Sequence, residues 1–195
     1  MLYNKFNFRI RDFVSKDRTR EELTGVFVEP NGTTATDAYS LVRVSAVKGE
    51  KREEIKESFK SFILPSEKAK EVERLAKEAE RKAVVPELNY VGVLSRKEDK
   101  VRIGRKDERG LIDSVESYLI EGEYPRYKDL LVERGKHIEI IVNPAFLERI
   151  AKFFKEFSKE NRVKIRIPVK ESQPIRFYEE RENQKAVALL MPMTK

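Results

Sequence analysis

Cysteine and tryptophan are absent from the sequence, and histidine occurs only once. Without cysteine the chain cannot form disulfides, thiolate metal sites or a cysteine nucleophile. Its eight glycines are scattered, and none forms the GxGxxG or GxxxxGK(S/T) spacing of a phosphate-binding loop. No apolar run approaches the ~20 residues that span a membrane, and the N-terminal MLYNKFNFRIRD lacks the apolar segment of a signal peptide. We therefore expect a cytoplasmic protein with no cofactor, no metal site and no membrane contact.

Charged residues, in contrast, are abundant. They make up 38% of the chain, and Lys and Arg outnumber Asp and Glu by 41 to 34, which gives a net charge of +7. A basic protein of this kind suits a polyanionic partner such as nucleic acid. Because the two signs are nearly balanced, mixed charge that only keeps the protein in solution explains the composition equally well. Both interpretations stay open at this point.

Alternation of apolar and polar residues predicts that much of the chain is β-structure. The Asn31-Gly32 turn between two such segments is a strong signal for a hairpin. Helical spacing of apolar residues predicts a helix over residues 67–82, behind a candidate N-cap at Ser66, and another that starts at Pro144. A third, stunted helix is predicted over residues 18–23. The predicted strands outside the hairpin cover residues 6–14, 61–65, 90–94, 100–104, 111–120, 137–142, 163–169, 175–179 and 186–191.

These elements form an internal repeat. The order strand, helix, three strands occurs twice, once from Ser61 and once from His137, and residues 49–60 form a charge-rich connection before the first of them. We therefore predict an α+β fold with antiparallel sheets and with helices on one face.

Candidate catalytic residues are few. His137 starts a predicted strand without a Ser or Cys partner at a suitable spacing, so we expect a surface histidine. Asp37 is the only acidic residue flanked by uncharged strand residues, and we expect its short side chain to bond nearby backbone amides. The other carboxylates lie in runs rich in Lys and Glu, which indicates a solvated surface or i,i+4 pairs such as Glu73 with Lys77. We predict a binding protein and not an enzyme.

Four separated motifs carry a resemblance to a known family. They are SKDRTREELTGVFV at residues 15–28, ATDAYSL at 35–41, GEYPRYKDLL at 122–131 and LLMPMTK at 189–195. In this order they resemble the bacterial sliding clamp, the β subunit of the replicative DNA polymerase. The resemblance implies a ring of repeated clamp half-domains around duplex DNA, which accounts for the internal repeat. It also implies that residues 1–133 correspond to the middle clamp domain, with its first helix truncated, and residues 134–195 to the C-terminal half of the third domain.

In these clamps the last strand and the tail line a hydrophobic groove that captures short peptide motifs of the polymerase and the clamp loader. The resemblance implies that both proteins are partners of this chain. Apolar and Met side chains accept varied peptides because Met is flexible and polarizable, and a few polar groups fix the orientation of the peptide. For Leu23, Leu41 and Leu189, a place in ordinary core is the alternative. By motif, the groove includes Leu23, Thr36, Ala38, Tyr39, Ser40, Leu41, Pro125, Leu130, Asn143, Phe146, Pro174, Leu189, Leu190, Met191, Pro192 and Met193.

The resemblance also implies contact with duplex DNA without sequence specificity, because clamp helices point Lys and Arg toward phosphates. Acidic residues share the helices concerned, so a solvated helix face is the alternative for each candidate. The DNA-binding candidates are Lys16, Arg18, Lys68, Lys70, Lys77, Arg81, Lys152 and Lys155.

The sequence departs from the family pattern in two ways. Ala38, Tyr39 and Ser40 stand where the family often has Gly-His-Arg, and Thr194 and Lys195 stand where it has Arg-Leu, so we expect a different peptide preference. The chain also aligns with only part of a three-domain subunit, and the unmatched parts carry the head-to-tail contacts of the family. A family ring contains about twelve half-domains and this chain about three, so roughly four copies would be needed for closure.

Two hypotheses follow from these observations. In the first, the chain is a shortened sliding-clamp-like processivity factor that binds replication peptides in its groove and encircles DNA as a homo-oligomer. In the second, it is a clamp-derived peptide-binding adaptor or inhibitor that never encircles DNA. The mass of the protein in solution separates the two, because a clamp must assemble into a closed multimer.

Overall fold

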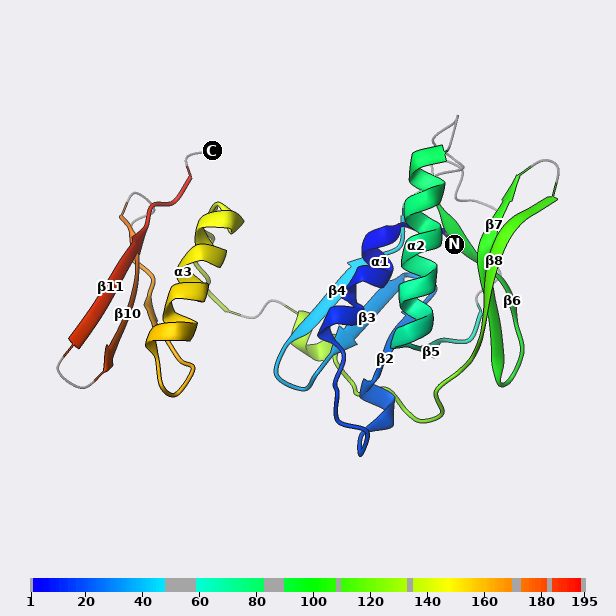
Figure 1. Ribbon diagram of the computed structural model, residues 1–195, viewed down its shortest axis with the longest axis horizontal. Helices are drawn as coiled ribbons and strands as arrows, with labels where there is room; N and C mark the ends of the chain where they lie inside the picture. The colour runs from blue at the N-terminus through cyan, green and yellow to red at the C-terminus, as the bar shows by residue number, and fades with distance from the viewer. Residues whose placement is uncertain are drawn as a thin grey trace. The chain divides into compact units, whose positions relative to one another are not determined.

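The chain divides into two compact units, Met1–Tyr127 and Lys128–Lys195, which we call unit 1 and unit 2. The structure, a computed structural model, describes residues 2–47, 59–82, 90–107, 110–132, 135–169, 173–181 and 184–193. Most of the predicted connection over residues 49–60 and the two residues Thr194 and Lys195 lie outside these ranges. Figure 1 shows helices packed beside sheets in each unit.

Unit 1 contains the order strand, helix, three strands twice. We call each such set a half-domain. The first half-domain consists of β1 (Leu2–Tyr3), α1 (Lys5–Arg9), the 3-10 helices η1 (Ile10–Phe13) and η2 (Glu21–Leu23), β2 (Gly25–Glu29), β3 (Gly32–Thr36) and β4 (Leu41–Ser45). The second consists of β5 (Phe62–Pro65), α2 (Ser66–Lys82), β6 (Val91–Arg96), β7 (Lys100–Asp107) and β8 (Gly110–Tyr118).

The two half-domains exchange their first strands. The sheets have the orders β4-β3-β2-β5 and β1-β6-β7-β8, so β5 joins the sheet of the first half-domain and β1 joins the sheet of the second. Both exchanged strands pair antiparallel, with Val26 opposite Leu64 and Tyr3 opposite Val91. The β2–β5 contact is tight, because a Cβ at Gly25 would lie 2.6 Å from Cγ2 of Ile63.

The core of unit 1 lies between α2 and the sheets. Ala69, Val72 and Leu75 recur at helical spacing along α2, and all three are buried in one cluster with Val26 and Phe8. The short α1 lies beside α2 (Figure 1), and the salt bridge from Lys5 to Glu80 (2.8 Å) links the two helices. The helix prediction for residues 67–82 and the Asn31-Gly32 hairpin are both confirmed.

The strand predicted over residues 6–14 is wrong, because α1 and η1 occupy this segment. The reason is local hydrogen bonding at Asn4, whose side chain accepts from the amide of Phe6, while the side chain of Asn7 accepts from the amide of Asn4. Such a capping box starts a helix. The stunted helix predicted over residues 18–23 is limited to η2, so the first half-domain takes its α-helix from α1 instead.

Unit 2 contains a single half-domain. Its helix α3 (Pro144–Phe157) packs on a sheet of three strands in the order β11-β10-β9. Phe154 of the helix and Phe177 of the sheet are the centre of a small core. The remaining elements of this unit are η4 (Lys128–Leu131), β9 (Lys164–Arg166), β10 (Ile175–Arg181) and β11 (Gln184–Leu190).

The strand predicted over residues 137–142 does not form. Among the described residues of unit 2, no strand lies beside this segment to complete a ladder. It is tied to the end of the chain by a hydrogen bond from the amide of Met193 to the carbonyl of Ile141 (2.8 Å). The antiparallel sheets with their few helices nevertheless confirm the predicted α+β class.

Candidate functional site

The loop between β3 and β4 of unit 1 contains several of the predicted groove residues. Asp37 shapes this loop, because its Oδ1 accepts hydrogen bonds from the amides of Ser40 (2.7 Å) and Tyr39 (3.0 Å). The backbone bond from Ser40 and then that from Tyr39 lower the pKa of Asp37 below its usual value. This is the backbone role expected for Asp37. Tyr39 projects from the loop and is almost fully exposed, and Ala38 beside it has φ of 75°, a conformation that favours glycine.

Residues 122–127 are held against the sheet of the first half-domain by two tyrosines. The ring of Tyr124 stacks on Phe27, with centroids 4.6 Å apart, and packs with Leu23. The ring of Tyr127 meets that of Phe27 edge-on, at 6.4 Å. Pro125 lies between the two tyrosines in the sequence and stays partly exposed. The rings of Tyr124 and Tyr127 therefore anchor this part of the third motif to the sheet, while Pro125 remains accessible.

A buried polar network holds Tyr127. Its hydroxyl contacts Glu29, and Arg43 donates both to this hydroxyl (2.6 Å) and to Oε2 of Glu29 (2.8 Å). Burial raises the pKa of Tyr127, and the hydrogen bond to Glu29 raises it further. Arg43 also reaches Asn31 at the turn of the hairpin (2.7 Å). The network thus connects the third motif to the β2–β3 hairpin.

Three predicted groove residues of unit 1 have structural roles. Leu23 is buried, and Leu41 packs against the same cluster of aromatic residues. The side chain of Thr36 is also largely buried, and its hydroxyl donates to the carbonyl of Ser40 (2.6 Å). The exposed surface of this region comes instead from Ala38, Tyr39 and Ser40.

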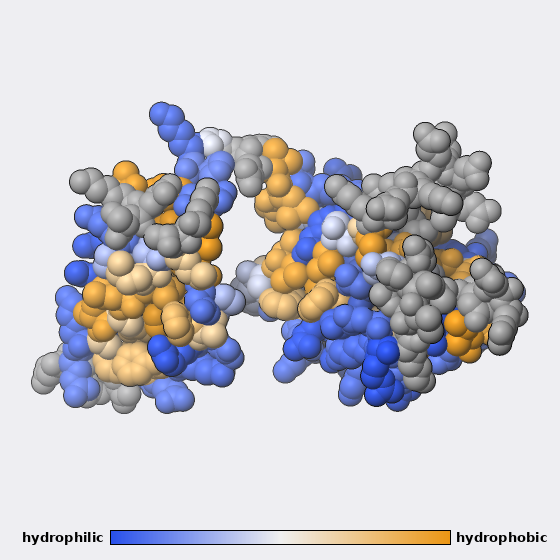
Figure 2. Space-filling view, turned by 90° about the horizontal axis from the view of Figure 1, so that it is seen from above, coloured by the Kyte–Doolittle hydropathy of each residue, from blue (hydrophilic) through white to orange (hydrophobic). Residues whose placement is uncertain are grey.

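The predicted groove residues at the end of unit 2 alternate between core and surface. Leu190 is buried against α3, whereas Leu189, Met191 and Met193 each expose half or more of their side chains. Leu130 is also exposed. Figure 2 shows apolar residues gathered on the face of unit 2 that it presents, at the left of the picture.

The start of α3 lies in the same unit. Asn143 is the N-cap of this helix, because its Oδ1 accepts from the amide of Ala145 (2.9 Å). Phe146 in the first turn is half exposed, and the guanidinium of Arg149 lies 5.2 Å from its ring centroid. Asn143 therefore has a structural role that the motif comparison did not identify.

A hollow of about 520 Å³ lies in unit 2 where Pro174 precedes β10. Ile167 and Val169 supply an apolar wall, and Arg166 and Arg176 supply charge. Of the predicted groove residues only Pro174 lines it, among the residues that the structure describes. A strand was predicted over residues 163–169, but β9 ends at Arg166, and Ile167 and Val169 beyond it are exposed. The predicted groove residues thus form one set in unit 1 and another in unit 2.

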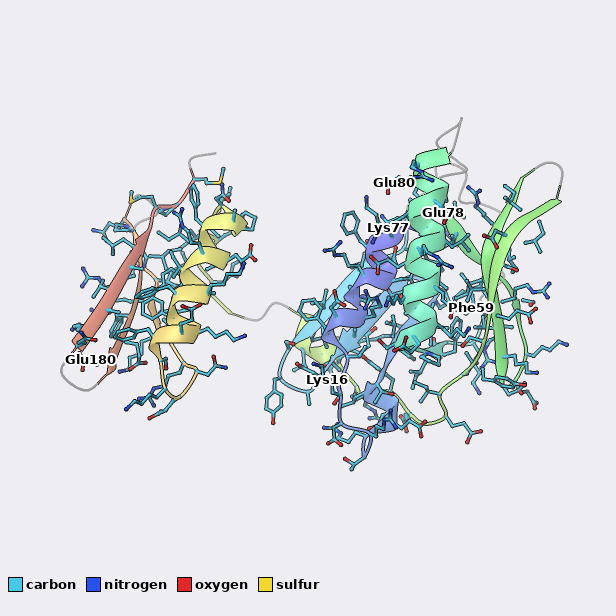
Figure 3. The ribbon with its side chains drawn as sticks, in the orientation of Figure 1. Lys16, Phe59, Lys77, Glu78, Glu80 and Glu180 are labelled. Atoms are coloured by element: carbon cyan, nitrogen blue, oxygen red, sulfur yellow. The ribbon has the colours of Figure 1, made fainter. Side chains whose placement is uncertain are left out.

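The DNA-binding candidates on α2 form part of a basic row. Lys70, Lys77 and Arg81 are exposed, and Arg74, which was not among the predicted residues, lies between them at the same helical spacing. Lys77 pairs with the buried carboxylate of Glu73 (2.6 Å), and Figure 3 labels it on this helix. Within the described ranges, no ion pair is formed by Lys70, Arg74 or Arg81.

The other DNA-binding candidates are distributed over both units. Lys68 pairs with Glu71 (2.9 Å) on α2, and Lys152 pairs with Glu148 (2.8 Å) on α3, so acidic neighbours offset part of their charge. Lys16, Arg18 and Lys155 are exposed, the first two in the loop before η2 and the third on α3. The row on α2 is therefore the strongest candidate among these sites.

The described part of the chain contains no group of three or more His, Cys, Asp or Glu residues that could hold a metal ion. Its helices are too short or too polar to span a bilayer.

The structure resembles solved sliding clamps. The clamp of Bacillus subtilis has a TM-score of 0.63 at 21% identity, over 96% of this chain and 46% of that one. The Caulobacter crescentus pol III beta has a TM-score of 0.67 at 19% identity, over 98% and 50%. The clamp of Bartonella birtlesii, solved bound to griselimycin, has a TM-score of 0.66 at 17% identity, over 100% and 51%.

No family model and no curated protein matches the sequence. The chain spans about half the length of the clamps that it resembles in structure. TM-scores between 0.63 and 0.67 establish a common fold, and the resemblance carried by the four motifs is confirmed at that level. The chain has the fold of the bacterial sliding clamps, the β subunits of DNA polymerase III.

Proposed function

We propose that the protein is a non-enzymatic, sliding-clamp-like processivity factor of the cytoplasm. It binds short peptide motifs of the replicative polymerase and the clamp loader, and it encircles duplex DNA as a homo-oligomer. The observation that carries the proposal is the clamp fold together with the exposed side chains of Leu189, Met191 and Met193 at the end of the last strand. One structurally similar clamp was solved bound to griselimycin, so a protein of this fold holds a ligand.

The exposed residues at the end of β11 suit an apolar peptide. Leu189, Met191 and Met193 retain about half of their surface for burial by a partner. Full burial of such a side chain contributes about 1.5–3 kcal/mol, so half of it contributes about 1 kcal/mol. Flexible Met side chains also adapt to different sequences. The affinity of this surface for a peptide is therefore the sum of about 1 kcal/mol from each of three side chains.

The experiment is calorimetric titration of the full chain with a peptide of the Gln-Leu-x-Leu-Phe type. We expect binding to the wild type and about fivefold weaker binding to Leu189→Ala, which corresponds to the loss of about 1 kcal/mol. Met193→Ala and Phe146→Ala are expected to weaken binding in the same direction, because both side chains are half exposed.

Leu111→Ala is the matched control for this titration. Leu111 is a leucine on β8 of unit 1 that is as exposed as Leu189, and it lies outside the predicted groove. Its substitution should leave the affinity unchanged. Absence of peptide binding to the wild type, or equal effects of Leu111→Ala and Leu189→Ala, would rule out the peptide-binding part of the proposal.

The DNA-binding part of the proposal is supported by the basic row on α2. Its four residues, at positions 70, 74, 77 and 81, extend over about 16 Å of helix, which is long enough to follow several phosphates. A surface of this kind binds any sequence, and its affinity falls steeply with salt.

The adaptor hypothesis predicts the same peptide binding without a ring. The two functions differ in topology, because only a closed ring stays on circular DNA at a salt concentration that removes phosphate contacts.

A further inference from the structure

In unit 1 each half-domain pairs with the other through two surfaces, its first strand and the open edge of its sheet. Each of its half-domains receives the first strand of the other, β5 at the edge of β2 and β1 at the edge of β6. The receiving strands become fully buried on their inner side, as Val26 on β2 and Val91 on β6 show. Unit 1 is therefore complete, because both first strands and both receiving edges are used.

Unit 2 has the same two surfaces, and in its described residues neither is paired with another strand. Residues 137–142 have the sequence of a first strand; Ile140 and Val142 pack on the core of the unit and Ile141 accepts a hydrogen bond from Met193, but the segment joins no sheet there. At the other end, β9 is the receiving strand by its position after α3, and its outer edge carries no strand in the described part of this unit. Ile165 points to the same side of the sheet as the buried Phe177 opposite it, yet it is 54% exposed, whereas Val26 is 0% exposed.

The helices of the two units show the same difference. Counted from its first residue, α3 has apolar side chains at the positions that α2 buries, with Leu147 corresponding to Ala69 and Phe153 to Leu75. Leu75 is 5% exposed, but Phe153 is 51% exposed. In unit 1 this face is covered by α1 and by the sheets of both half-domains. In unit 2 the equivalent positions are also apolar, but the described residues cover them only in part: Phe154 is buried in the core of the unit, whereas Leu147 and Phe153 stay exposed.

The partner that would complete unit 2 is itself a half-domain with an open sheet edge and a first strand that is not yet part of a sheet. Unit 1 cannot supply it, because its first strands are already paired. A second copy of unit 2 supplies both parts at once, and two identical surfaces that satisfy each other are the basis of a two-fold symmetric dimer.

The charges of the two surfaces are complementary. In an antiparallel pairing that keeps Ile165 on the inner side, it lies opposite Ile138 or Ile140, because these alternate with Glu139 along the segment. Glu139 then lies directly opposite Lys164 in the first register and Arg166 in the second. Opposite charges at such positions stabilise a strand pair by about 0.2–1 kcal/mol.

We propose that two copies of the chain associate through unit 2, where each adds residues 137–142 as a fourth strand to β9 of the other and covers Phe153 of the other's α3. The dimer contains one complete clamp domain made from two chains, in addition to the complete unit 1 of each. This inference rests on the fold and on the exposed residues of unit 2. It holds whether or not peptides or DNA bind.

Light scattering on a sizing column tests the association with the full chain. The wild type is expected at twice the 22.9 kDa of one chain or at an even multiple of it. Phe153→Glu and Ile165→Lys are each expected to shift it toward the single-chain mass, while circular dichroism stays unchanged because both side chains are exposed in the isolated unit. A wild type that remains a single chain at about 100 μM overturns the proposal, since a specific interface typically binds more tightly than this.

Disulfide trapping tests the register, and the absence of native cysteine leaves no background. A chain with Glu139→Cys is mixed with a chain that carries Arg166→Cys or Lys164→Cys. We expect a covalent dimer from one of these mixtures, because residues directly opposite in a strand pair lie within disulfide range. Glu139→Cys mixed with Lys185→Cys on β11 is the control that should stay unlinked. A dimer that both surface variants leave intact, or trapping no better than in the control, assigns the contact to another surface and overturns the proposal.

Discussion

Arg43→Met is expected to destabilise unit 1 strongly. The side chain of Arg43 is 19% exposed and that of Glu29 is 6% exposed, and the two are joined at 2.8 Å with Tyr127 beside them. Methionine keeps much of the apolar stem but removes the charge, so Glu29 is left as a buried carboxylate whose remaining contacts include Tyr127. Breaking one side of a buried pair in this way costs about 3–5 kcal/mol, a large part of the roughly 5–15 kcal/mol by which domains are stable.

Arg102→Met is the matched control for this variant. Arg102 is also a strand residue of unit 1 with a carboxylate partner, Glu116, but both side chains are largely exposed. Its loss should cost only about 0–1 kcal/mol. Urea denaturation followed by tyrosine fluorescence measures both, because six of the seven tyrosines lie in unit 1. Equal losses for the two variants would refute the reasoning that burial makes the Arg43 network important.

Three further predictions concern the loop, the acid response and the basic row. Ala38→Gly is expected to raise the free energy of unfolding by about 0.5–1 kcal/mol, because φ of 75° strains alanine by about 1–2 kcal/mol. Thermal denaturation measures this, and a midpoint lower than that of the wild type would contradict it. Burial alone would raise the pKa of Glu73, but hydrogen bonds and charges from Lys77 and Arg11 lower it below its usual value. The ionised Glu73 therefore stabilises the fold above the ordinary carboxyl pKa, and this stabilisation is lost as the pH falls through the lowered pKa of the folded state. Denaturation at a series of pH values should show a smaller loss of stability in acid for Glu73→Gln than for the wild type. Combined alanine substitution of Lys70, Arg74 and Arg81 on α2 should reduce the salt slope of duplex binding by about 0.9 for each lost phosphate contact. The matched control is combined alanine substitution of Lys97, Lys100 and Arg102, three exposed basic residues of the β6–β7 hairpin, which should leave the slope unchanged.

The sequence predicted those elements that form through contacts between residues close together in the chain. The helix α2 was readable because its apolar residues recur at helical spacing over many residues, and the hairpin was readable because Asn31-Gly32 is a specific turn. The role of Asp37 followed from its short side chain. The exposure of Leu189 beside the buried Leu190 also follows from alternation along β11.

Elements that depend on a capping bond or on a distant partner were predicted less well. Residues 6–14 alternate like a strand, yet the bonds between Asn4 and Asn7 start a helix there. Residues 137–142 also alternate, but alternation does not supply the neighbouring strand that a ladder needs. The network of Glu29, Arg43 and Tyr127 joins residues far apart in the sequence, so no spacing rule could find it. Arg74 was not among the candidates on α2, although it continues the basic row at helical spacing.

Retention on circular DNA tests most directly whether this clamp fold works as a clamp. The protein is allowed to thread onto linear duplex, the ends are ligated, and the circles are washed at a salt concentration that removes phosphate contacts. The account predicts that protein stays on the ligated circles and is released when a restriction enzyme cuts them. Equal loss from circular and linear DNA in the wash would show that no ring forms, and it would contradict the clamp function.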